Sequence, residues 1–325
     1  MKQKNEDLLT LGIDLGGTKV KAALVDSKGK ILSAHKYPTN PEKGVDGVIE
    51  DILKCIDGCL GDNIQKAEAL GIGIAAQVDL KGNVINAPNL RWHNIPLKKI
   101  LEEKLGIPVF VLNDVNAATW GEWRYGSGKN VSDLVVIFVG TGVGGGVISG
   151  SKMVIGCNNS GGELGHITIV LDGRQCHCPN KGCLEAYAGG WAIAERAQEA
   201  VRANPQNGKQ LISLAGAIEN ITAKTVGDAY YKKDPLSIQL IGETIQYLAA
   251  GAVSIVNAFN PRILILGGGV IEGMPELINE IEKIAKEKAL ESSLIDLKIT
   301  KAALGGDAGV IGAAIFAQNE IKGIQ

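Results

Sequence analysis

Residues 10–25 read TLGIDLGGTKVKAALV, a polar, glycine-rich turn flanked by two apolar runs of strand-like composition. With the next apolar run, they predict a three-stranded meander over residues 8–15, 19–25 and 30–37. Glycines between strands let the backbone approach a ligand and direct N–H groups toward an anion. Asp14 ends the first strand, where a carboxylate can hold Mg²⁺ through water. An ordinary hairpin turn with a surface lysine is the alternative interpretation.

The same pattern returns at residues 133–155, where a second meander again has glycines in its first turn and helical segments follow. A plan that occurs twice predicts two α/β lobes with a ligand cleft between them. We expect the boundary directly after Asp114. The small lobe would comprise residues 1–114 and a closing helix at 307–325, and the large lobe residues 115–306.

Two further glycine runs follow predicted strands. Residues 140–146 contain a formal G-x-G-x-x-G, but a strand rather than a helix comes next, which excludes a dinucleotide-binding fold. The run at 267–269 follows the strand-like RILIL, and it suits close contact with a base or a phosphate. An ordinary loop before a helix is its alternative interpretation. Together, the three turns predict a nucleotide held from both lobes.

Asn113 and Asp114 follow the apolar run VFVL. A carboxylate at such a strand end can accept a proton from an attacking hydroxyl, and the neighbouring amide can orient that hydroxyl. The alternative is an Asx turn or a helix N-cap, because the following residues suit the start of a helix.

Three cysteines gather within CHCPNKGC, residues 176–183, and a histidine lies ten positions upstream of the first. Four soft ligands are the number that tetrahedral zinc requires, and a site filled by protein ligands is structural. His177, inside the cysteine pair, competes with His166 as the fourth ligand. The predicted zinc ligands are His166, Cys176, Cys178 and Cys183.

Composition narrows the class of protein. The 325 residues are 45% hydrophobic and 21% charged, with a formal net charge of −2, so the sequence gives no electrostatic reason to expect a nucleic acid or a membrane as partner. The N-terminus lacks a secretory signal, and the apolar run at 247–259 is too short to span a bilayer. We therefore expect a cytoplasmic protein. Cys55 and Cys59, four apart on a predicted helix, are interpreted as packing residues.

These pieces resemble the ROK family of repressors and sugar kinases, whose fold is the two-lobed actin-like ATPase (ribonuclease H-like) α/β fold with nucleotide and sugar in the interlobe cleft. The matching stretches are IDLGGTK, VLNDVNAA, GTGVGGG, GGELGH, CHCPNKGCLE and the C-terminal GGG. The resemblance implies an ATP-dependent hexokinase of carbohydrate metabolism, most simply a glucokinase of glycolysis, that uses Mg²⁺, carries structural Zn²⁺ and forms a homodimer or homotetramer.

The resemblance also implies a role for each matching residue. Asp114 would be the catalytic base that accepts the proton of the sugar C6 hydroxyl. His166 would bind zinc with one ring nitrogen and the sugar with the other. The residues implied to contact sugar hydroxyls are Asn113, Glu163, His166 and Glu185. Those implied to hold the nucleotide are Asp14, Gly16, Gly17, Thr18, Lys19, Gly140, Thr141, Gly142, Gly267, Gly268 and Gly269.

Two positions depart from the family pattern. Pro179 stands where glycine is frequent after the second cysteine, and we expect the zinc site to tolerate it. Residues 75–77, Ala-Ala-Gln, replace the usual Pro-Gly near the sugar. The sequence therefore leaves open N-acetylmannosamine, N-acetylglucosamine, mannose or fructose as the sugar, and polyphosphate as the donor. A sugar-responsive repressor is the rival function. Such repressors of the family carry a DNA-binding module before the first glycine turn, and the thirteen residues that precede Asp14 are too few for one, so we expect a kinase instead.

Overall fold

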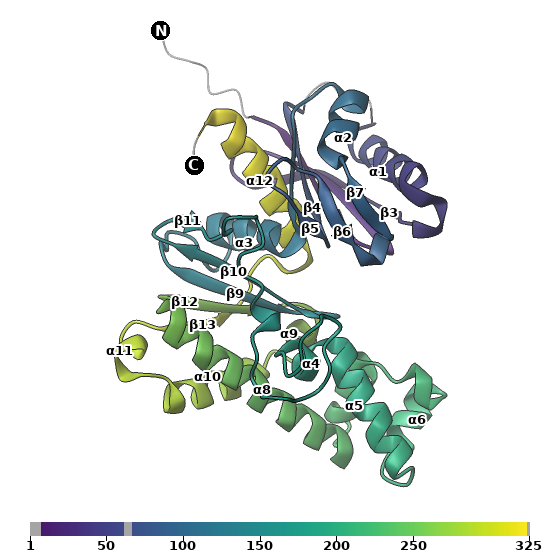
Figure 1. Cartoon of the computed structure of the whole chain (residues 1–325), viewed down its shortest axis with the longest axis vertical. Helices are drawn as coiled ribbons and strands as arrows, with labels where there is room; N and C mark the ends of the chain where they lie inside the picture. Colours follow the sequence, from purple (N-terminus) through teal and green to yellow (C-terminus); the bar gives the residue numbers. More distant parts are fainter. Residues whose placement is uncertain (1–7, 62–66, 324–325) are drawn as a thin grey trace. The chain divides into compact units, whose positions relative to one another are not determined.

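A computed structural model describes residues 8–61 and 67–323 and divides the chain into two compact α/β units (Figure 1). The first unit comprises residues 1–130, 154–161 and 306–325, and the second comprises residues 131–153 and 162–305. Within the described residues, no helix combines the length and the hydropathy that crossing a bilayer requires.

The first unit is built on a five-stranded sheet of order β3-β2-β1-β4-β8, in which β1, β2 and β3 form the predicted antiparallel meander. Strands β4 and β8 extend the sheet parallel to β1. A smaller sheet, β5-β6-β7, was not predicted from the sequence. The elements are β1 (Thr10–Leu15), β2 (Lys19–Val25), β3 (Ile31–Pro38), α1 (Gly44–Leu60), β4 (Ala69–Ile74), β5 (Gln77–Val78), β6 (Val84–Ala87), β7 (Trp92–Ile95), α2 (Leu97–Leu105), β8 (Val109–Asn113), α3 (Asp114–Tyr125) and α12 (Ala308–Lys322).

The second unit repeats this plan in a sheet of order β11-β10-β9-β12-β13, again an antiparallel meander extended by two parallel strands. The predicted internal repeat is therefore present. The elements are β9 (Leu134–Val139), β10 (Val143–Ser149), β11 (Lys152–Met153), α4 (Glu185–Ala188), α5 (Gly190–Ala203), α6 (Lys209–Ala215), α7 (Ala223–Tyr231), α8 (Pro235–Phe259), β12 (Ile263–Gly267), α9 (Gly269–Gly273), α10 (Leu277–Lys288), α11 (Glu291–Leu294) and β13 (Lys298–Lys301).

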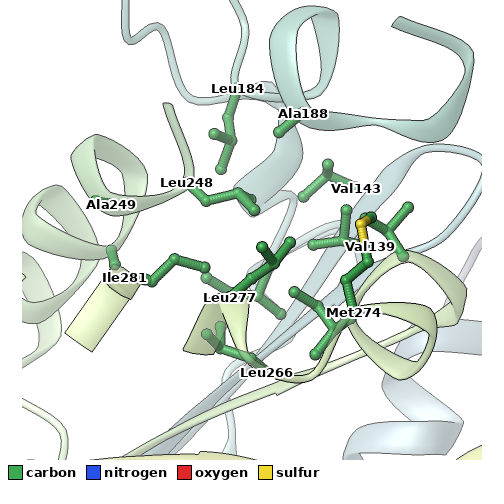
Figure 2. Close-up of a cluster of buried hydrophobic side chains, with 14 of the residues drawn as sticks. Val139, Val143, Leu184, Ala188, Leu248, Ala249, Leu266, Met274, Leu277 and Ile281 are labelled. Atoms are coloured by element: carbon green, nitrogen blue, oxygen red, sulfur yellow. The ribbon is translucent and has the colours of Figure 1, made fainter. Parts of the chain in front are cut away.

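The core of the second unit lies between its sheet and helices α8 and α10. Figure 2 shows Val139 and Val143 of the sheet gathered with Leu248 of α8 and Leu277 of α10, and all four are buried. Burying a side chain of this size contributes about 1.5–3 kcal/mol. Because β9 and β12 are parallel neighbours, this core holds the glycine turns after both strands at the same edge of the sheet.

Helix α12, the last helix of the chain and drawn in yellow in Figure 1, packs on β1 and β4 of the first unit. The contact is made by backbone. A Cβ atom added at Gly12 would lie 1.9 Å from the carbonyl oxygen of Val310, and one added at Gly71 would lie 1.8 Å from that of Ala313. No side chain larger than hydrogen fits at either position.

The same helix packs closely on α3, where a Cβ atom at Gly312 would lie 1.7 Å from the carbonyl oxygen of Ala117. Helix α3 therefore belongs to the first unit, which continues to Asn130, beyond the boundary expected after Asp114. The two boundaries differ because the packing of α3 on α12 holds α3 in the first unit, whereas the expected boundary was placed where the apolar run before Asp114 ends. Helix α12 lies in the first unit.

We expect Gly71→Ala to lower the free energy of unfolding by about 3 kcal/mol or more, because the added methyl group meets backbone that cannot rotate away. Gly242→Ala is the matched control: it lies within α8 and an added Cβ atom has open space. This control should leave stability unchanged or raise it by up to about 1 kcal/mol. Urea unfolding followed by circular dichroism measures both, and equal effects would contradict the packing argument.

Candidate active site

The predicted base and its neighbour lie where β8 meets α3. The side chain of Asn113 is the N-cap of α3, and its Oδ1 atom accepts hydrogen bonds from the backbone N–H groups of Val115 at 2.9 Å and Asn116 at 3.1 Å. Its amide nitrogen donates to the carbonyl of Ala76 at 3.3 Å. The N-cap interpretation thus holds for Asn113. Asp114 is the first residue of the helix and is half-buried, where the N-terminal helix dipole favours a negative charge.

The first glycine turn keeps a partly buried carboxylate at the end of β1. Burial raises the pKa of Asp14 above its ordinary value, and the charges of Lys21 and Lys19 only partly offset this. Gly309 of α12 lies close by, since a Cβ atom there would be 3.2 Å from Asp14 Cγ. The Gly16 N–H donates to the carbonyl of Lys19 at 3.0 Å and closes the turn.

The remaining residues of this turn differ in exposure. Thr18 and Lys19 are exposed. Gly17 packs against Asn89, because a Cβ atom at Gly17 would lie 2.9 Å from the Asn89 carbonyl oxygen. The side chain of Lys21 on β2 contacts the two residues that precede α12, by donating to the Gly306 carbonyl at 3.2 Å and by pairing with Asp307. The turn is therefore fixed to the N-terminal end of α12.

The second unit contains a pocket of about 770 Å³ at the edge of the sheet where β9 and β12 end. Both glycine runs reach it through Gly140, Thr141 and Gly269. Its lining includes the aromatic residues Trp191 and Tyr231, which no sequence motif had indicated. The remaining lining residues are Gly190, Ala194, Thr222, Ala223, Lys224, Gly227, Asp228, Val270, Gly273 and Met274.

The other predicted glycines serve close packing behind this pocket. Gly268 has a φ of +87°, and a Cβ atom there would lie 2.6 Å from the carbonyl oxygen of Val139. Gly267 packs against Phe138, with a Cβ-to-ring distance of 2.8 Å. At Gly142 a Cβ atom would lie 2.3 Å from Glu185 Oε2, so this glycine admits the Glu185 carboxylate.

Glu185 is held from two sides. Its Oε2 atom accepts a hydrogen bond from the backbone N–H of Val143 at 2.8 Å, and its Oε1 atom accepts one from the indole N–H of Trp191 at 3.3 Å. Glu163 is exposed and directly precedes the 3₁₀ turn Leu164–His166.

The predicted zinc ligands come together in the second unit. One ligand atom from each of the four residues lies within 4.8 Å of the others. The Sγ atoms of Cys178 and Cys183 are 3.6 Å apart, and Cys176 Sγ lies 3.7 Å from His166 Nδ1. Tetrahedral zinc with bonds of about 2.3 Å sets sulfur atoms about 3.8 Å apart, so these residues fit the ion. The contact through Nδ1 leaves Nε2 of His166 for another partner.

Burial raises the pKa of the Cys176 thiol to about 12, so a bound cation would have to displace this proton. The side-chain amide of Gln175 braces the loop by donating to the carbonyl groups of Cys176, Cys178 and Asn180. His177, the competing fourth ligand, is exposed and stacks on Trp191. The geometry thus groups His166, rather than His177, with the three thiols.

The loop that departs from the family pattern borders a separate pocket of about 420 Å³ in the first unit. Gln77 and Asp79 line it together with Cys157, Asn158 and Ser160. Asn159 ties its two sides together by donating from its side-chain amide to the carbonyl of Val78 at 3.0 Å.

The ROK family model matches residues 10–320. The chain belongs to the ROK family. This ROK chain is 36% identical over 316 residues to the glucokinase of Streptomyces coelicolor, covering 95% of this chain and 98% of that one. It is 32% identical to the glucokinase of Thermotoga maritima, with coverage of 97% and 99%.

Among solved structures, a ROK family glucokinase from Streptomyces griseus in complex with glucose and AMPPNP is 37% identical. The match covers 96% of this ROK chain and 99% of that one, with a TM-score of 0.84. The predicted two-lobed actin-like ATPase fold is therefore confirmed for this ROK protein.

The raised pKa of Asp14 predicts a pH-dependent stability effect. Because the folded-state pKa lies above the unfolded value of 3.8, protonation favours the folded state, and that contribution is lost as the pH rises through the folded-state pKa. We expect Asp14→Asn to raise the Tm at pH 7 without divalent cations, and this gain to shrink as the pH falls toward 3.8.

Asp133→Asn is the control, for which we expect a change in Tm of the opposite sign. Hydrogen bonds from Ser132, Gly150 and Ser149 hold the pKa of the half-buried Asp133 below its ordinary value, so this substitution should lower the Tm at pH 7. Differential scanning fluorimetry between pH 4 and pH 8 measures both variants. A lower Tm for Asp14→Asn than for the wild type at pH 7 would contradict the assignment.

Proposed function

We propose that this chain is an ATP-dependent glucokinase that transfers the γ-phosphoryl group of ATP to the C6 hydroxyl of glucose, with Asp114 as the general base. The observation that carries the proposal is the pocket of about 770 Å³ bordered by Gly140, Thr141 and Gly269, in a chain closely similar to glucokinases over nearly its whole length. Glu185 packs against the same glycine turn.

The nucleotide is assigned to this pocket. Its apolar and aromatic walls suit a purine, and glycines at the strand ends allow phosphates to approach the backbone. Asp14 would hold Mg²⁺ through water, and the cation would neutralise the charge that develops on the phosphates. The raised pKa of Asp14 supports this role, since a buried carboxylate gains most from a cationic partner.

The sugar is assigned to Asn113, Glu163, His166 and Glu185. Asp114 would accept the C6 hydroxyl proton, while Asn113, whose side chain is already fixed as an N-cap, would orient the alcohol. The contacts of Glu185 with Val143 and Trp191 hold its carboxylate ready to accept hydrogen bonds. Most of the rate enhancement would come from positioning and electrostatics.

The cysteine cluster is proposed to hold structural zinc. With the ion on Nδ1 of His166, Nε2 remains to contact a sugar hydroxyl, so the metal would fix the orientation of a substrate ligand. We further propose that the protein works in the cytoplasm, where a reducing environment keeps these thiols available for metal, as a homodimer or homotetramer in glycolysis.

The decisive measurement of function is a coupled assay of ADP release with glucose, N-acetylmannosamine, N-acetylglucosamine, mannose and fructose, each with ATP or polyphosphate. We expect glucose with ATP to give the highest kcat/KM. Turnover that is equal with and without sugar would refute the kinase proposal, and a preference for another sugar would correct the substrate.

Asp114→Asn should lower kcat on the order of 10²-fold or more, the scale for removing a general base. Glucose binding, measured by calorimetry, should change little because the substituted amide keeps the size of the carboxylate. Turnover close to that of the wild type would remove Asp114 from the role of base.

Cys176→Ser should release the metal and raise the KM for glucose, because His166 loses the ion that fixes its ring. Cys157→Ser is the matched control, since Cys157 is an exposed thiol outside the cluster. Metal content is measured by plasma mass spectrometry. Zinc retained in Cys176→Ser, or absent from the wild type, would defeat the assignment.

A further inference from the structure

Trp191 touches three functional parts of the second unit. Its indole N–H donates to Glu185 Oε1 at 3.3 Å. Its ring stacks on the imidazole of His177, with centroids 3.9 Å apart and planes inclined by 17°. Trp191 also lines the pocket of about 770 Å³.

The stacked pair connects Trp191 to the cysteine loop. His177 lies between Cys176 and Cys178, both of which contribute ligand atoms to the cluster. The position of the imidazole is therefore set by the loop that a bound ion would hold. Near-parallel stacking makes the plane of the indole follow the plane of the imidazole.

The carboxylate of Glu185 has one fixed support and one adjustable support. Its Oε2 atom is held by the backbone N–H of Val143, which rotation of a side chain cannot move. Its Oε1 atom depends on the indole of Trp191. The backbone of Trp191 is itself anchored, because its N–H donates to the carbonyl of Thr141 at 3.0 Å, so the remaining freedom is the rotation of the indole.

We propose that Trp191 is a positioning residue that couples the cysteine loop and the nucleotide pocket to the Glu185 carboxylate. A nucleotide in the pocket would pack against one part of the indole, and a metal ion in the cysteine loop would fix His177 against the face of the indole. Both events hold the N–H toward Oε1 and so orient Glu185. The assignment of the ligands rests on the proposed function, whereas the coupling itself rests on the contacts of Trp191.

The coupling is testable without turnover, by acrylamide quenching of tryptophan fluorescence. Trp92, Trp120 and Trp123 are each less than a tenth exposed, whereas Trp191 is half-buried, so quenching reports chiefly on Trp191. ADP should reduce quenching in the wild type, and removing metal with a chelator should increase it. Both responses should disappear in Trp191→Phe, and His177→Ala should lose the chelator response.

Kinetics give the second readout. Trp191→Phe keeps an aromatic ring for stacking but loses the N–H donor, and we expect the KM for glucose to rise about tenfold, the scale of one hydrogen bond to a charged group, with a smaller change in kcat. His177→Ala should raise the same KM. In the double variant, the rise in KM relative to the wild type should be smaller than the product of the two single-variant fold-changes, because the two residues act together. Lys181→Ala, an exposed residue of the same loop, is the control.

The outcomes separate the two hypotheses. An unchanged KM in Trp191→Phe, or quenching that responds to neither ADP nor chelator, overturns the role of Trp191 while leaving a glucose-dependent wild-type kinase intact. A wild type that responds in the quenching experiment but phosphorylates no sugar overturns the proposed function and retains the coupling.

Discussion

Direct backbone contact between helix α12 and the first sheet fixes the geometry of the first unit. Gly12 and Gly71 leave no room for a side chain where α12 crosses β1 and β4, and Gly312 does the same against α3. Helix α12 thereby helps to position Asp14 and Asp114, the two carboxylates of that unit with a proposed role in catalysis. Gly309 lies against Asp14, and α3, whose first residue is Asp114, packs along the same helix.

The second unit uses the repeated sheet for a different purpose. Its two parallel strands β9 and β12 end in glycine turns that border one pocket, and its long helix α8 and helix α10 supply the core beneath. The cysteine loop lies near that pocket through the stack of His177 on Trp191. A single aromatic side chain thus contacts elements that the sequence presents as separate motifs.

The local pattern of apolar residues was sufficient to predict the longer strands. The meander predicted over residues 8–15, 19–25 and 30–37 corresponds to β1, β2 and β3, because short apolar runs separated by turn residues are a local pattern. The short strands β5, β6 and β7 escaped prediction, since they are two to four residues long and their stability comes from pairing rather than from pattern.

The amino-acid sequence alone was enough to place glycine turns at strand ends, a carboxylate after β8 and four metal-type ligands in one stretch, because each is a local motif with a fixed chemical meaning. The folded structure was needed to show which glycines border the pocket and which, such as Gly268, lie in close contact with a neighbouring strand. It was needed also to reveal Trp191 and to group His166 rather than His177 with the thiols. Contacts between residues distant in the chain depend on packing, which no local pattern encodes.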